Sequence, residues 1–273
     1  MRIAFSTIVC PDWPLDQLAA KAVEHGFGGV ELELDRARYS IDAESIHAAF
    51  RSAGVRICSL DTGLTFIDYP HADQATAETL RGAIDLARSL ECPTVVMSGA
   101  EARRRANRSS TALRFSDWLL PLGDYAAERG VNVLVENVHS FRLANELWLI
   151  LDRLEHPAVA CCWNIASALL AGESPTVSVP TLNSRIAMIH ADDQLVATGS
   201  VQALFTRMRG IGYGGWVVYS PGESAGEDPD EVLPVVGKRL QEVVNPAPQK
   251  APAAAKPAGK PEAKKPPMRV TPA

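Results

Sequence analysis

Residues 131–137 read VNVLVEN, a short apolar run that ends on two polar residues, Glu136 and Asn137. Such a valine-rich run, directly after Gly130, is typical of a buried β-strand. The same unit, a short apolar run followed by a longer amphipathic segment, repeats along the chain. We expect eight strands at residues 2–6, 29–33, 55–60, 94–98, 131–136, 159–164, 186–190 and 216–220.

The segments between these runs carry a helical pattern. LDQLAAKAVEHG (15–26), AESIHAAFRSAG (43–54) and TAETLRGAIDLARSLE (76–91) place apolar residues three and four positions apart. Gly26, Gly54 and Gly130 follow such segments, as helix-ending glycines do. Alternating strands and helices favour parallel strand pairing through right-handed crossovers, so we predict an α/β fold, a (β/α)8 TIM barrel over residues 1–244.

The main alternative is an open, doubly wound sheet. That fold normally carries a glycine-rich phosphate-binding turn after its first strand. Here the turn reads STIVCPDWP (6–14), which contains neither GxGxxG nor GxxxxGK[ST]. The closed barrel is therefore the favoured prediction.

Charge and proline content mark a boundary near residue 245. Residues 245–273 hold six basic residues, one acid and eight of the 19 prolines, whereas the preceding body has 21 basic and 31 acidic residues. A segment with so little apolar surface cannot offset its ordering entropy, so we predict a disordered Pro/Ala/Lys-rich tail at 245–273. The acidic body disfavours nucleic acid as a partner, because it would repel phosphates.

The composition is that of a soluble cytoplasmic protein. The chain has 273 residues, 47% of them hydrophobic, and no apolar run near the roughly 18 residues of a membrane span. The N-terminus reaches prolines too early for a signal peptide, and the five cysteines form no CxxC pair. We therefore expect reduced, buried cysteines and no membrane partner, while a homo-oligomer is left open.

Polar side chains follow the predicted strands. In a barrel the active site lies where the strands end, so these residues should converge on one mouth. Glu136 stands out because a carboxylate directly after VLV needs a cation, a proton or a hydrogen-bond network. His190 ends the run IAMIH. The strand-end residues are Ser6, Glu31 or Glu33, Asp61, Ser98, Glu136 with Asn137 and His139, Asn164, His190 with Asp192 and Asp193, and Ser220.

Five short strings resemble the xylose-isomerase-like barrels, a group of sugar and sugar-phosphate isomerases and epimerases that includes the type IV apurinic endonucleases. They are GFGGVELEL (26–34), LVENVHSF (134–141), WNIASALLAGESP (163–175), MIHADD (188–193) and IGYGGWVVYSPGE (211–223). The resemblance spans roughly residues 1–243. It implies one divalent cation, such as Mn(II) or Mg(II), held by Glu, Asp, His and Glu from strands five to eight, with the two glutamates moving a proton between adjacent carbons of a ketose.

Carried over by position, the resemblance matches Glu136 and His190 but not the other two ligands. Asn164 stands where the family has Asp, and Ser220 stands where it has the last Glu. The implied metal set is therefore Glu136, Asn164, His190 and Ser220, with Glu136 also catalytic. Fewer carboxylates weaken the hold on a hard cation, so the cation is bound weakly or is absent.

Other positions of the resemblance concern the substrate. Ser167 replaces a substrate-binding His, and Asp192 replaces the usual Lys of the seventh-strand string, although Asp193 keeps the acid. The substrate-binding candidates are Glu31, His139, Ser167 and Asp193. Glu223, on the loop after the last strand, is a replacement candidate for the missing glutamate.

Two functions stay open on this basis. One is an isomerase or epimerase that performs metal-assisted proton transfer on a small ketose or related polyol. The other is a catalytically inactive barrel that binds a sugar-like ligand or a protein partner. Whether the chain is an enzyme is not decided by the sequence.

Overall fold

The strands of the protein follow the predicted positions closely. The structure, a computed structural model, describes residues 1–34, 43–68, 73–103, 107–192, 200–221 and 226–246. The barrel strands are β1 (Arg2–Ser6), β2 (Gly29–Glu33), β3 (Arg56–Asp61), β5 (Thr94–Met97), β7 (Asn132–Glu136), β8 (Val159–Asn164), β9 (Ile186–Ala191) and β10 (Trp216–Tyr219). Two short strands, β4 (Phe66–Ile67) and β6 (Ala100–Glu101), pair separately.

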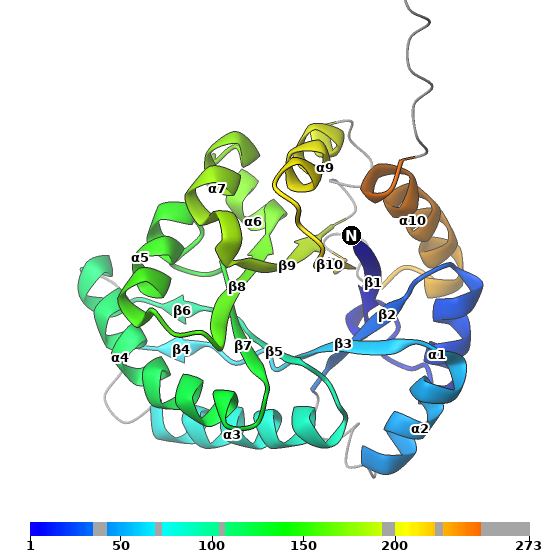
Figure 1. The fold of residues 1–273 in the computed structure, drawn as a ribbon, viewed down its shortest axis with the longest axis horizontal. Coiled ribbons are helices and arrows are strands. Elements are labelled where there is room, and N and C mark those ends of the chain that lie inside the picture. The colour runs from blue at the N-terminus through cyan, green and yellow to red at the C-terminus, as the bar shows by residue number, and fades with distance from the viewer. Residues whose placement is uncertain (35–42, 69–72, 104–106, 193–199, 222–225, 247–273) are drawn as a thin grey trace, which may run out of the picture.

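Helices surround these strands (Figure 1). They are α1 (Leu15–Glu24), α2 (Ala43–Ala53), α3 (Asp73–Ser89), α4 (Arg108–Ala127), α5 (Ala144–Leu154), α6 (Ile165–Leu170), α7 (Pro175–Leu182), α9 (Ser200–Gly210) and α10 (Pro229–Val244), with short 3-10 turns η1 (Thr7–Val9) and η2 (Asn183–Arg185). None of the described helices combines the length and the apolar character that crossing a bilayer requires.

The strands close into a parallel barrel in the order β1-β10-β9-β8-β7-β5-β3-β2. The α/β barrel prediction is therefore confirmed. The register aligns Glu136 with Cys162, and Asn164 with His190. Because the strands are parallel, their carboxyl ends share one rim, and the polar residues that end them face a common mouth.

The inside of the barrel is filled by a small apolar layer. Its buried residues come from seven strands: Ala4, Cys58, Val96, Leu134, Cys162, Met188, Trp216 and Val218. A separate, larger core cluster includes buried residues of both strands and helices, such as Val133 and Leu147. Inner-layer residues alternate with these along each strand, so the residue two positions after Cys162, Asn164, points to the inside as well.

All five cysteines are free and buried, as expected. The predicted tail from residue 247 onward, Asp193 and Glu223 lie outside the described residues. The domain boundary near residue 245 stays a prediction, and helix α10 ends at Val244.

Candidate active site

Glu136 ends strand β7 at the barrel mouth and is nearly buried, with 7% of its surface exposed. The loop that follows β5 packs against the backbone of Glu136. Gly99 has a φ of +57°, and a Cβ at this position would lie 2.5 Å from the Glu136 carbonyl oxygen. Only glycine allows this close approach, so Gly99 is part of what positions the carboxylate.

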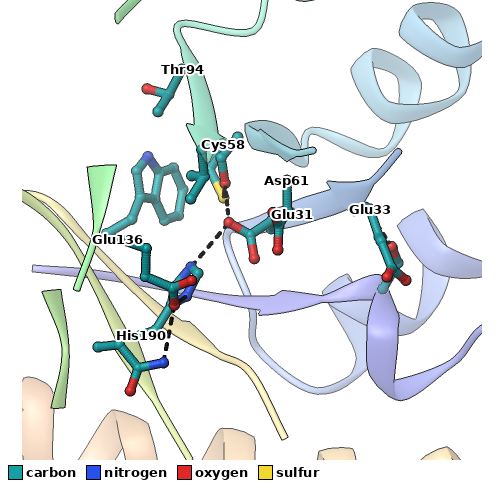
Figure 2. Close-up of polar contacts among 12 residues, drawn as sticks. Glu31, Glu33, Cys58, Asp61, Thr94, Glu136 and His190 are labelled. Atoms are coloured by element: carbon teal, nitrogen blue, oxygen red, sulfur yellow. Dashed lines mark hydrogen bonds and ion pairs between the residues drawn. The ribbon is translucent and has the colours of Figure 1, made fainter. Parts of the chain in front are cut away.

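His190 is hydrogen-bonded to two glutamates. Its Nδ1 lies 2.7 Å from Glu136 Oε1, and its Nε2 lies 3.1 Å from Glu31 Oε2. The Ser59 hydroxyl donates to the same Glu31 oxygen at 2.8 Å. Figure 2 shows Glu31 and Glu136 converging on the His190 ring. The Glu31 residue is fully buried, and its other oxygen, Oε1, has no hydrogen-bond partner among the described residues.

Asn164 joins this network through its amide. Its Nδ2 donates to Glu136 Oε1 at 3.0 Å, and its Oδ1 accepts the backbone N–H of Ser167 at 2.9 Å, capping helix α6. Asn137 holds the Asn164 backbone from the neighbouring strand, because its Oδ1 accepts from Asn164 N at 2.6 Å and its Nδ2 donates to Asn164 O. The amide oxygen of Asn164 is thus turned toward the helix, and its NH2 group toward the carboxylate.

This buried network places opposite charges next to each other. Burial opposes a charged imidazole, yet Cys162 and the carboxylates of Glu31 and Glu136 raise the pKa of His190 well above its usual value. Burial would raise the pKa of Glu136, but the charge and hydrogen bond of His190 and the hydrogen bond from Asn164 lower it. The arrangement therefore favours an imidazolium beside an ionised Glu136.

Asp61 ends strand β3 at the same mouth and is half-buried. Burial, followed by the negative charges of Glu31 and Glu136, raises the pKa of Asp61 to about 7. Its Oδ1 accepts the backbone N–H of Gly63 at 3.0 Å, which opposes the shift. The sequence placed Asp61 at a strand end but assigned it no role, because the neighbouring glutamates come from other strands.

Cys162 adds a potential metal ligand that the sequence reasoning missed. Ligand atoms of Glu136, Cys162 and His190 lie within 4.8 Å of one another, so these three residues could hold a metal ion. Burial raises the pKa of the Cys162 thiol to about 12. Its position two residues before Asn164 on β8 was the available signal, since residues two apart share a strand face.

The remaining predicted site residues lie around this centre. His139 is exposed at the rim, where its Nε2 is 3.1 Å from Thr65 Oγ1. Ser167 is buried on α6 behind Asn164. Ser220 follows β10, half-buried, and its N–H donates to the Ala191 carbonyl; no described contact joins its side chain to Glu136 or His190.

Residues 19–231 match the sequence profile of the xylose isomerase-like TIM barrels. The chain belongs to the xylose isomerase-like TIM barrel family. This assignment agrees with the closed parallel barrel and covers Glu31, Glu136 and His190. A search of curated proteins finds no match.

Solved structures similar to this family member include sugar epimerases. D-allulose 3-epimerase from Methylomonas sp. is 18% identical, with a TM-score of 0.76 over 89% of this chain and 97% of that one. D-psicose 3-epimerase from Clostridium cellulolyticum H10, solved with D-tagatose, is 13% identical, with a TM-score of 0.75 over 89% and 99%. The IOLI protein, solved with a zinc atom, is 14% identical, with a TM-score of 0.76 over 89% and 98%. At such low identity these similarities show the fold alone.

Proposed function

We propose that this member of the family is a sugar or sugar-phosphate isomerase or epimerase that moves a proton on a small ketose or related polyol. The observation that carries the proposal is a pair of carboxyl groups at one mouth whose pKa values are pushed apart. That of Glu136 is lowered, and that of Asp61 is raised to about 7. Such a pair suits a base and an acid that work together near neutral pH.

The proposed chemistry assigns each group a role. The ionised Glu136 takes a proton from the carbon beside the ketose carbonyl, leaving an enediolate, and the Asp61 carboxyl group returns a proton to the carbon skeleton. The His190 imidazolium, held between Glu31 and Glu136, provides a fixed positive charge next to the developing negative charge. After turnover the two carboxyl groups exchange protons with solvent.

A cation at this mouth would be held by Glu136, Cys162 and His190 once the thiol and the imidazolium have lost their protons, so a bound ion would replace the positive charge of His190. One carboxylate, one thiol and one imidazole suit a borderline ion such as Zn(II) better than Mn(II) or Mg(II), which prefer oxygen ligands. Asn164 presents its NH2 group rather than its oxygen to the mouth, which fits a hard cation poorly. A bound ion would polarise the substrate carbonyl.

Polar residues around the mouth would contact the substrate. Glu31 Oε1 is a buried acceptor without a partner among the described residues, and a substrate hydroxyl would satisfy it. His139, at the exposed rim, is a proposed contact for the distal end of the substrate. Ser167 and Asp193 keep their proposed substrate roles, although Asp193 is outside the described residues.

The second candidate is a barrel that binds a sugar-like ligand without turnover. One observation favours it. Both ring nitrogens of His190 are hydrogen-bonded to glutamates of the protein, so neither is free to contact a substrate. A binder would retain affinity for ketoses and show no product.

Product analysis of a ketose panel distinguishes the two functions. The wild-type protein is incubated with C5 and C6 ketoses and their phosphates, with and without Zn(II), and the sugars are separated by chromatography. The proposal expects an isomer or epimer of at least one ketose, and its loss in Glu136→Gln but not in Glu101→Gln, which removes an exposed carboxylate from β6. Ketose binding by the wild type without any product would contradict turnover and support the binder.

A further inference from the structure

A cavity of about 590 Å³ lies at the opposite end of the barrel from Glu136 and His190. It is lined by residues at the start of strands, including Arg2 of β1, Arg56 of β3 and Trp216 of β10, and by Arg51 near the end of α2. Pockets for small molecules have volumes of about 300–1,000 Å³. The cavity is therefore large enough for a ligand of the size of a small organic molecule.

The wall of this cavity carries a surplus of positive charge. Within the described parts of the chain, Arg2, Arg51 and Arg56 form no ion pair with a carboxylate. The acid on the wall is Glu91, whose Oε2 lies 3.4 Å from Nε2 of His47, a further wall residue. Three guanidinium groups and one carboxylate leave this hollow with a positive surplus, in contrast to the formal net charge of -5 of the whole chain.

The floor of the cavity is apolar. Cys58, Met188 and Trp216 line it and also belong to the inner layer of the barrel, which separates it from the mouth. The Arg2 guanidinium lies 4.2 Å from the centroid of the Trp216 ring. Gly29 leaves room for this ring, because a Cβ there would lie 2.8 Å from Trp216 Cη2. The indole is thereby fixed and buried in the floor, with the Arg2 guanidinium covering its ring.

We propose that this cavity binds a small organic phosphate. The guanidinium groups of Arg51 and Arg56 hold the phosphate, and the apolar part of the ligand packs on the Arg2 guanidinium, which covers the Trp216 ring. Guanidinium groups pair with phosphate through two parallel hydrogen bonds. A phosphate monoester, with nearly two negative charges and three acceptor oxygens, matches three arginines better than a single carboxylate does. The site is independent of the proposed proton transfer, because neither Glu136 nor His190 lines it.

Calorimetric titration with phenyl phosphate tests the proposal, since this probe joins a phosphate to a flat apolar ring. Inorganic phosphate at the same ionic strength serves as the second probe. We expect one binding event per chain, with phenyl phosphate at least about tenfold tighter than inorganic phosphate. Arg51→Gln and Arg56→Gln should each weaken binding by about tenfold, because each removes a charged hydrogen-bond donor pair.

Arg88→Gln is the matched control, because Arg88 is an exposed arginine of α3 that does not line the cavity. It should change the affinity by less than about twofold. The substituted residues Arg51, Arg56 and Arg88 are all exposed, so the variants should fold. Thermal melting checks this. Equal weakening by Arg88→Gln, equal affinity for the two probes, or no binding by the wild type at millimolar phenyl phosphate would each overturn the proposal.

Discussion

His190 Nδ1 lies 2.7 Å from Glu136 Oε1, a contact between residues 54 positions apart in the chain. The opposite ring nitrogen contacts Glu31, so one imidazolium neutralises part of the charge of two buried carboxylates. Removing one partner of a buried ion pair is costly, because the remaining charge stays buried without compensation. The histidine is therefore central to both the stability and the proposed chemistry of the mouth.

His190→Gln should lower the free energy of unfolding by about 3–5 kcal/mol, because Glu31 and Glu136 lose their cation. Urea unfolding at pH 7 measures this change. Adding Glu31→Gln to the same chain should recover part of the loss, since one of the two uncompensated carboxylates disappears. A loss below about 1 kcal/mol in the single variant would show that His190 is not charged in the folded protein.

Asp61→Asn should alter the pH dependence of stability. The folded protein holds a proton on Asp61 up to a pKa of about 7, whereas the unfolded chain releases it near pH 4. Wild-type stability therefore falls as the pH rises from about 4 to 7, and the neutral Asn escapes this loss. Relative to wild type, the variant should gain about 1–3 kcal/mol between pH 5 and pH 8.

The control for this comparison is Asp12→Asn, which removes an exposed aspartate. Its unfolding free energy should run parallel to that of the wild type across the same pH range. If Asp61→Asn also runs parallel, Asp61 ionises at its ordinary pH in the folded protein and cannot serve as the proposed acid.

Much of the fold was predictable from local pattern. The strand predicted at 131–136 ends at Glu136, as β7 does. The helical pattern at 43–54 corresponds to α2, Ala43–Ala53. Burial of apolar residues at a fixed period is a local property, so the chain order of strands and helices appears in the sequence. The convergence of Glu136, Asn164 and His190 follows from the same pattern, because all three end neighbouring parallel strands.

The contacts inside the site were not predictable in this way. Glu31 meets His190 across 159 positions of sequence, and only closure of the barrel brings their strands near. The orientation of the Asn164 amide depends on two competing neighbours, the Ser167 N–H and the Glu136 carboxylate. The pKa of Asp61 depends on carboxylates from strands β2 and β7. Such effects arise from three-dimensional proximity rather than from residue type.

Cys162→Ala should weaken binding of Zn(II) by at least about tenfold, because it removes the sulfur ligand that Zn(II) favours. Calorimetry at pH 8 measures the affinity. Cys161→Ala is a matched control, since it removes a buried thiol from the adjacent residue, which faces away from the inner layer. Equal effects of the two substitutions would contradict a role for Cys162 in metal binding.

The double substitution Asn164→Asp with Ser220→Glu should restore a carboxylate-rich set for a hard cation. Asp also caps helices, so the Oδ1 contact to Ser167 N can persist. The hydrogen bond from Asn164 Nδ2 to Glu136 is lost, and two carboxylates then lie side by side. A cation bound between them offsets their repulsion. We expect Mn(II) affinity to rise by about 100-fold in calorimetry. The control is Asn132→Asp, which adds a carboxylate at the other end of the barrel and should leave the Mn(II) affinity unchanged. An unchanged Mn(II) affinity in the double variant would contradict the ligand positions that the family resemblance implies.

Hydrogen exchange between a ketose and solvent measures proton transfer at Glu136 without the need to identify a product. The protein is incubated in D2O with each ketose and ketose phosphate of the panel, and NMR follows the carbon-bound hydrogens beside the carbonyl. We expect the wild type to incorporate deuterium into at least one ketose, and Glu136→Gln to do so at least about 100-fold more slowly. Absence of deuterium in every ketose that the wild type binds, or an equal rate in Glu136→Gln, would contradict proton transfer at Glu136.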